Sequence, residues 1–286
     1  METNTSTETN TAVETDAFFR EYTSQDAILK YTKATAGFGI SYLLDHDYKT
    51  VYLEALRHLP QHIRQQPIRI LEFGCGGGMN LLHLVSVLGQ EGIQVDQAIG
   101  ADFSPVLIEA AKREAKNHLR DEEQSKVAFL VAKNETLIED LSESMRKTRS
   151  ELESSFHFIL GVNTIRYCHR AGKELDCAQA ILNLLAPGGI CVVIDMNNRF
   201  PLFRSALKNR FRKQKEEECY LPSLEEYEAP FRKSGFEVLR AEHFCWIPHS
   251  AGGFMCGLLS RMSPLLNFVA RSRAMRSLVV ARKPAA

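Results

Sequence analysis

Beyond Gln66 the sequence alternates between short apolar runs and longer amphipathic stretches, and this alternation most constrains the fold. The short runs have the length and composition of β-strands. They occupy residues 68–73, 97–102, 127–132, 156–161, 190–195, 236–245 and 276–283. The intervening stretches have apolar residues at helical spacing, such as Leu81, Leu84 and Leu88. Strands that alternate with helices predict βαβ units, so we expect an α/β fold with a doubly wound, mostly parallel seven-stranded sheet.

The rest of the chain divides around this alternating region. Residues 1–16 contain six threonines and four acidic residues but no basic residue, which predicts a disordered tail. Residues 17–66 have apolar side chains on one helical face and predict an N-terminal helical lid. Residues 67–286 form the main domain. Within it we expect helical insertions at about 199–234 and 249–275, the second of them before the last strand.

Composition narrows the class of protein. The 35 basic residues balance 35 acidic ones, so a nucleic-acid partner is not expected. Apolar runs fall short of the roughly 20 residues of a membrane-spanning helix, and the N-terminus lacks the features of a signal peptide. The seven cysteines form no C-x-x-C pair and the nine histidines no H-E-x-x-H motif. We therefore expect a cytoplasmic protein without a metal centre, and its oligomeric state stays open.

The most specific stretch is the glycine-rich segment after the first predicted strand. Four glycines, at positions 74, 76, 77 and 78, separate that strand from a predicted helix. Backbone without Cβ atoms can approach a ligand closely, and the start of a helix offers free N–H groups. A tight turn alone needs only one or two glycines. The segment therefore predicts a bound cofactor.

Spacing and acidic residues distinguish between cofactors. A dinucleotide fingerprint requires a third glycine three positions after Gly76, where this chain has Met79. Glu72 lies two positions before the first glycine, and a carboxylate is costly to bury there without hydrogen-bond donors. Asp102 ends the second predicted strand, where its two oxygens can accept hydrogen bonds from two ribose hydroxyls. A nicotinamide-dependent oxidoreductase is thus disfavoured and remains an alternative.

At this point residues 66–245 resemble the class I S-adenosylmethionine-dependent methyltransferases. The stretch E-F-G-C-G-x-G resembles the family's first motif, residues 100–105 (GADFSP) its second, and residues 186–189 (APGG) the turn before its fifth strand. The resemblance implies a Rossmann-like fold and a methyltransferase enzyme. It also implies S-adenosylmethionine as cofactor and S-adenosylhomocysteine as product.

The resemblance also implies roles for individual residues. The methionine end of the cofactor would be held by Glu72, Gly74, Cys75, Gly76 and Gly78. Asp102 would hold the ribose, and Phe103 would lie against the adenine. Asn134 or Glu135 stands where the family often has an aspartate for the adenine amino group, and His157 replaces a common fourth-strand aspartate. Gly161 and Tyr22 complete the expected cofactor set.

Acceptor residues should lie beyond the carboxyl ends of the strands and on the N-terminal helices. His169 is a candidate general base, because a neutral imidazole can remove a proton near pH 7. Tyr31 is the other candidate catalytic residue. The expected substrate contacts are Asn163, Arg166, Met196 and Trp246. Each has a plain structural alternative, namely a solvated or structural histidine, a surface charge or a packing aromatic residue.

The C-terminal part combines apolar spacing with positive charge. After Glu242 the chain has no acidic residue but six basic ones. Apolar residues recur at helical spacing from Phe254 to Val269, and Ser263-Pro264 predicts the start of a second short helix. We expect an apolar substrate cover with peripheral membrane or lipid contact. The alternative is a helical hairpin on the sheet edge with its arginines in water.

Taken together, these features predict methyl transfer by in-line substitution to a small, hydrophobic or lipid-like acceptor, as in small-molecule or secondary metabolism. The resemblance leaves the acceptor atom open. A non-catalytic regulatory subunit that binds S-adenosylmethionine is the main alternative.

Overall fold

The computed structural model describes residues 37–201 and 221–285. Its centre is a seven-stranded sheet with the order β3-β2-β1-β4-β5-β7-β6. The strands are β1 (Ile68–Phe73), β2 (Val95–Asp102), β3 (Val127–Val131), β4 (Phe156–Val162), β5 (Leu185–Met196), β6 (Glu237–Phe244) and β7 (Arg276–Arg282). Strands β1 to β5 are parallel to one another, whereas β7 is antiparallel to both β5 and β6. The predicted α/β, doubly wound sheet is confirmed.

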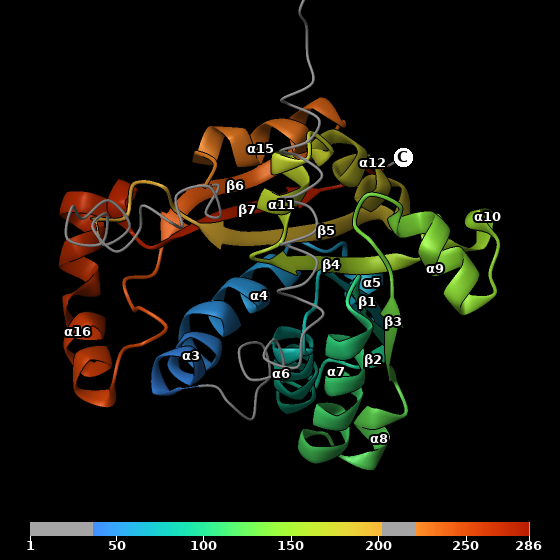
Figure 1. Ribbon diagram of the computed structural model, residues 1–286, viewed down its shortest axis with the longest axis horizontal. Helices are drawn as coiled ribbons and strands as arrows, with labels where there is room; N and C mark the ends of the chain where they lie inside the picture. The colour runs from blue at the N-terminus through green and yellow to red at the C-terminus, as the bar shows by residue number, and fades with distance from the viewer. Residues whose placement is uncertain (1–36, 202–220, 286) are drawn as a thin grey trace, which may run out of the picture.

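Helices cover both faces of this sheet (Figure 1). One layer contains α3 (Phe38–Tyr42), α4 (Lys49–Leu56), α5 (Gln61–Arg64), α6 (Met79–Gln90), α7 (Pro105–His118) and α8 (Asp121–Gln124). The other contains α9 (Leu137–Met145), α10 (Arg149–Leu152), α11 (Ile165–Arg170), α12 (Glu174–Leu184) and α15 (Leu224–Lys233). Alternate residues of a strand point to opposite faces. Accordingly Ile70 belongs to the apolar core under the first layer and Leu71 to the core under the second.

The N-terminal helical segment is part of the core where the structure describes it. Helix α3 continues through a π-helical turn, η2 (Leu43–Tyr48), directly into α4. Tyr52 of α4 is completely buried, and its ring packs edge-on against Phe158 of β4. The tail 1–16 and the first part of the predicted lid, residues 17–36, lie outside the described residues, so the lid remains a prediction.

The insertion before the last strand is one long helix, α16 (Gly253–Ala270). The predicted start of a second helix at Ser263-Pro264 is therefore wrong, because Pro264 lies inside α16. A proline there removes the bond to the Ser260 carbonyl, and on a surface helix water can hydrate that group. Ser263 Oγ donates to the Leu259 carbonyl at 2.8 Å.

Two further segments complete the comparison with the predicted elements. The predicted turn at residues 187–189 is an irregularity within β5, with Gly188 at φ +77°. Helix α15 begins with a capping box, in which Ser223 Oγ accepts from the Glu226 N–H at 3.2 Å. Of the insertion predicted at 199–234, residues 202–220 lie outside the described ranges. In the described part of the chain, no helix has the length and hydropathy to span a bilayer.

The strand order determines where a ligand can bind. In the sheet, β2 and β3 lie on one side of β1, and β4 and the later strands lie on its other side, so the strand order reverses at β1. In open α/β sheets such a reversal opens a crevice at the carboxyl ends of the strands. The glycine segment after β1 and Asp102 at the end of β2 both lie at this edge.

Candidate functional site

The glycine segment forms a loop whose backbone most residues would strain to adopt. Gly74, Gly76 and Gly78 have φ values of +62°, +53° and +79°. A Cβ at Gly74 would lie 2.1 Å from Oγ1 of Thr164, and a Cβ at Gly78 would lie 2.8 Å from the Phe129 ring. Glycine at these two positions thus lets the loop pack against the loop after β4 and against β3.

Asp102 holds this loop in place. Its Oδ2 accepts a hydrogen bond from the Gly76 N–H and its Oδ1 one from the Ser104 N–H, both at 2.9 Å. The side chain is buried, which raises the pKa of the Asp102 carboxyl, while the two N–H donors counteract that rise. Ser104 also caps α7 through the Leu107 N–H at 3.3 Å. One carboxylate therefore links the glycine loop to the end of β2 and the start of a helix.

Glu72 is the second acidic residue at this edge, and it is completely buried. Its Oε2 accepts from the Leu81 N–H of α6 at 2.9 Å. Its Oε1 is buried without a well-formed hydrogen bond in the described ranges. Burial raises the pKa of Glu72 to about 8, against the opposing effects of the Leu81 N–H and the Asn80 side chain. Such an orphaned acceptor suits a ligand that carries N–H donors and positive charge.

Tyr52 adds a second unsatisfied polar atom near Glu72. Its hydroxyl is buried without a hydrogen-bond partner among the described residues. Burial raises the pKa of Tyr52 well above its ordinary value, and the charge of Glu72 adds to the rise. Cys75 on the loop is also buried, and burial keeps the pKa of its thiol high. The thiol therefore stays protonated, and the Cys75 N–H donates to the Ala101 carbonyl at 2.9 Å.

The expected adenine contacts lie at the ends of β2 and β3. Asn134 Nδ2 donates to Thr164 Oγ1 at 2.9 Å, so it joins the loop after β3 to the residue that contacts Gly74. Glu135 is exposed, and Phe103 is partly buried directly after Asp102. A Cβ at Gly161 in β4 would lie only 2.3 Å from the Phe73 ring, so packing requires glycine there.

Asn163 lies on the expected acceptor side, at the end of β4. It has a φ of +57°, and its Oδ1 accepts from Arg276 Nη1 at 2.8 Å. Arg276 opens β7 and is buried, although its Nε has no hydrogen-bond partner in the described ranges. Its other terminal nitrogen contacts Nε2 of His249. Desolvation of the His249 ring and the charge of Arg276 lower the pKa of His249 to about 3, although the residue as a whole is exposed.

Arg166 lies beside a buried carboxylate. Its guanidinium is 3.5 Å from Asp195 Oδ1 and lies over the Tyr167 ring. Asp195 is buried, which raises its pKa, and the charge of Arg166 opposes that rise. Met196 follows as the last residue of β5, and its N–H donates to Asp195 at 2.8 Å. Arg166 and Met196 thus lie together at the ends of β4 and β5.

Trp246 and His169 are the other predicted residues that the structure describes. Trp246 is buried in a third apolar cluster, and its Nε1–H donates to Asn267 Oδ1 of α16 at 2.8 Å. His169 is partly buried on α11. Tyr22 and Tyr31 lie outside the described residues.

Sequence reasoning missed Thr164, Asp195, Arg276 and Tyr52. Asp195 ends a strand as Asp102 does, and the same signal could have identified it. Arg276 and Tyr52 have no local signal, because their neighbours come from distant parts of the chain.

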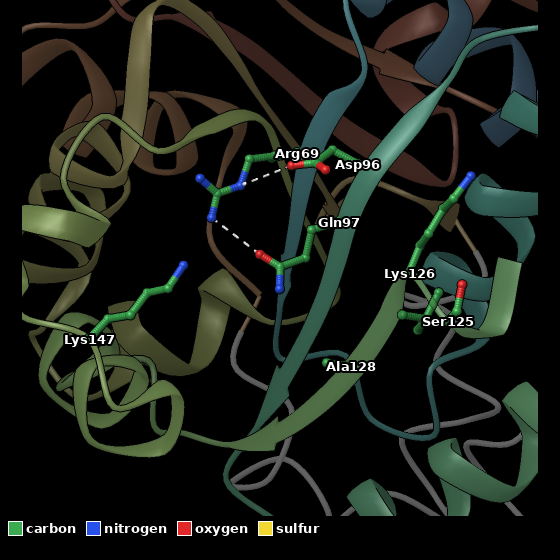
Figure 2. Close-up of a pocket in the computed structure, with 8 residues that line it drawn as sticks. Arg69, Asp96, Gln97, Ser125, Lys126, Ala128 and Lys147 are labelled. Carbon is green, nitrogen blue, oxygen red and sulfur yellow. Dashed lines mark hydrogen bonds and ion pairs between the residues drawn. The ribbon is translucent and has the colours of Figure 1, made fainter. Parts of the chain in front are cut away.

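A pocket of about 370 Å³ lies at the opposite edge of the sheet. It is formed where β1, β2 and β3 begin, and Figure 2 shows Arg69 directed toward Asp96 and Gln97. Lys126 and Lys147 also line it. Since the glycine loop and Asp102 lie at the carboxyl ends of these strands, this pocket is separate from the candidate site. Within residues 37–201 and 221–285, no group of acidic, histidine or cysteine side chains could hold a metal ion.

A seven-stranded sheet with one antiparallel strand, a glycine loop after β1 and carboxylates at the ends of β1 and β2 define the class of Rossmann-like methyltransferases. Residues 44–241 match the model of the methyltransferase domain family, and the chain belongs to that family. The family resemblance inferred from the sequence is thereby confirmed. Membership implies S-adenosylmethionine as cofactor. No curated protein matches the chain at a significant level of sequence similarity.

Solved structures share this fold at low sequence identity. The [4+2]-cyclase SpnF has a TM-score of 0.53 and 16% identity, over 83% of this chain and 82% of its own. The CMeT domain of citrinin polyketide synthase has 0.58 and 16%, over 91% of this chain and 56% of its own. A phosphoethanolamine N-methyltransferase 2 from Haemonchus contortus, in complex with S-adenosylmethionine, has 0.53 and 17%, over 95% and 57%. This chain thus spans little more than half the length of the last two.

Proposed function

We propose that the protein transfers the methyl group of S-adenosylmethionine to a small, hydrophobic or lipid-like acceptor. The observation that carries the proposal is the pair of buried carboxylates around the glycine loop. Asp102 orients the loop through Gly76, and Glu72 keeps one oxygen unsatisfied within the same edge of the sheet. An amino-acid ammonium group would supply the donor and the positive charge that Glu72 lacks.

In this proposal the cofactor lies along the ends of β1, β2 and β3. Glu72, Gly74, Cys75, Gly76 and Gly78 bind its methionine end, and Asp102 accepts hydrogen bonds from its ribose. Phe103 and either Asn134 or Glu135 contact its adenine, with Gly161 and Tyr22 completing the set. Bound there, S-adenosylmethionine supplies a methyl group on a positively charged sulfur.

The chain's own contribution is to orient the acceptor and exclude water. In-line substitution depends on positioning more than on side-chain chemistry. Asn163, Arg166 and Met196 lie where β4 and β5 end, beside the cofactor edge, and are the proposed substrate contacts together with Trp246. His169 on α11 would accept a proton from the acceptor, and Tyr31 is the other candidate for that role.

The names of the structural neighbours are a reason to test turnover in this protein as well as cofactor binding. One is called a [4+2]-cyclase and another an N-methyltransferase, so this fold serves more than one reaction. A regulatory subunit that binds S-adenosylmethionine without turnover is the second candidate function.

Calorimetric titration with S-adenosylmethionine tests the cofactor site. Asp102→Ala should weaken binding by roughly 1 to 3 kcal/mol, or about 5- to 150-fold, because a charged hydrogen-bond acceptor is lost. Asp96→Ala is the matched control, since Asp96 lies at the other end of β2 with an exposed side chain. Equal affinity in both variants, or preference for a nicotinamide cofactor, would refute the assignment.

Incubation with apolar and polar acceptor pools tests the reaction. We expect S-adenosylhomocysteine to accumulate with the apolar pool. Binding of S-adenosylmethionine without product in any pool would instead support the regulatory subunit.

A further inference from the structure

Helix α16 has an apolar outer face. Phe254 and Phe268 are 86% and 88% exposed, and five more large apolar side chains of the helix are also exposed. At 100° per residue, the seven fall within an arc of about 140°. They are Phe254, Met255, Leu258, Met262, Leu265, Phe268 and Val269. A surface helix normally places polar residues on this side, so the pattern marks a surface for interaction.

The opposite side of α16 is firmly held. Cys256 is buried, and Leu259 and Leu266 pack against the apolar cluster that contains Trp246. The Trp246 ring N–H binds Asn267 of the same helix. The rotation of α16 is thus determined by its inner face, and the outer apolar face cannot turn inward without breaking these contacts.

A neighbouring element extends the exposed face. Phe38, the first residue of α3, is itself exposed, and its ring lies 3.4 Å from where a Cβ of Gly253 would be. Figure 1 shows α16 at one end of the molecule with α3 beside it. The apolar surface therefore continues from α16 onto the start of α3.

Positive charge surrounds this surface. From His243 to the end of the chain there is no acidic residue. Arg261 lies within the apolar arc, and Arg273 follows α16 in η3 (Arg271–Arg273). Arg271 pairs with Glu242, whereas Arg261 and Arg273 are exposed and form no ion pair within the described ranges.

We propose that α16 binds the surface of an anionic lipid bilayer, with Phe254, Leu265 and Phe268 in the interface and Arg261 and Arg273 near the headgroups. An amphipathic helix with basic residues beside an apolar face binds membranes in this way. The helix lacks the hydropathy needed to span a bilayer, so it lies in the membrane plane. A second copy of the chain fits less well, because a two-fold contact would bring arginines together with no carboxylate from these helices.

The proposal does not depend on the reaction, and flotation of the full chain with vesicles tests it. We expect flotation with vesicles that contain phosphatidylserine and little with pure phosphatidylcholine. The double variant Phe254→Ser, Phe268→Ser and the double variant Arg261→Glu, Arg273→Glu should each lose roughly tenfold or more in vesicle affinity. Leu175→Ser is the matched control, because Leu175 is an exposed apolar residue on a different helix, α12.

Melting temperature and S-adenosylmethionine binding, measured on the same variants, separate this test from that of the proposed function. Both should stay unchanged, since the altered side chains lie in solvent. Absence of flotation, or equal flotation of all variants, would overturn the proposal. So would a dimer in sedimentation analysis that Leu265→Asp dissociates, because the face would then bind a second copy.

Discussion

At the scale of single residues, Glu72 shows how a candidate binding residue can lower the stability of the folded protein through its burial. A completely buried carboxyl with few hydrogen-bond donors is costly to ionise, and this is why burial raises the pKa of Glu72 to about 8. The free protein therefore keeps Glu72 mostly neutral at pH 7. A cationic group at the orphaned Oε1 would favour the charged form.

Replacement of this carboxyl should stabilise the free protein. Glu72→Gln keeps an oxygen for the Leu81 N–H but cannot ionise. Because the folded pKa lies above the unfolded value of 4.5, the wild type loses stability as pH rises from that value through about 8. We expect the variant to be more stable at pH 7 by roughly 1 to 3 kcal/mol, with little difference at pH 4. Urea unfolding at both pH values measures this, and a less stable variant at pH 7 would contradict it.

The same residue should make cofactor affinity pH-dependent. If the proposed site is correct, S-adenosylmethionine binds the ionised form of Glu72, so affinity should rise from pH 6 toward pH 8 by up to about tenfold per unit. Glu72→Gln should bind more weakly and with a flatter profile. Titration of both proteins across this range isolates Glu72 from the cofactor's own amino group. Parallel profiles would show that Glu72 does not bind the cofactor.

At the scale of elements, α4 connects the core to the site. Tyr52 of α4, and Tyr48 at the end of η2 just before it, both direct hydroxyls into the interior without a hydrogen-bond partner among the described residues. Their rings pack on Phe158 of β4 and Phe244 of β6, respectively. The rings therefore stabilise the fold, whereas the unsatisfied hydroxyls add no hydrogen bond to it.

Two substitutions at Tyr52 separate these roles. Tyr52→Ala should cost roughly 3 to 5 kcal/mol, because it leaves a cavity against the sheet. Tyr52→Phe should leave the free energy of unfolding unchanged or slightly raised, since it removes an unpaired buried hydroxyl. Thermal melts measure both, and weaker S-adenosylmethionine binding by Tyr52→Phe would assign the hydroxyl to the site. Strong destabilisation by Tyr52→Phe would mean that the hydroxyl is paired.

At the scale of the whole molecule, cofactor binding should stabilise the fold. A ligand at 100 times its dissociation constant adds about 2.7 kcal/mol to the free energy of unfolding. For a chain of this size that corresponds to a rise in melting temperature of roughly 5 to 10 °C. Differential scanning fluorimetry with S-adenosylmethionine measures the rise. Asp102→Ala should reduce this rise, whereas Asp96→Ala, the control, should show the same rise as the wild type.

Features that depend on nearby residues could be predicted from the sequence. The seven strands follow from short apolar runs, and the glycine loop follows from the glycines between β1 and α6. The cap at Ser104 depends on contacts within a few residues. The carboxylates could be identified because Asp102 is the last residue of β2 and Glu72 is the second-last residue of β1.

Other features depended on which strands became neighbours. Arg276 reaches Asn163 only because β7 lies beside β5, which lies beside β4. The rotation of α16 follows from contacts with Trp246, and the predicted break at Pro264 did not occur because the helix lies at the surface. The sequence by itself determined the local elements and the acidic residues at their ends, since backbone propensity and hydrophobic period are short-range. The tertiary structure alone decided that Glu72 is buried with an unpaired oxygen and that α16 faces outward, because burial is set by elements distant along the chain.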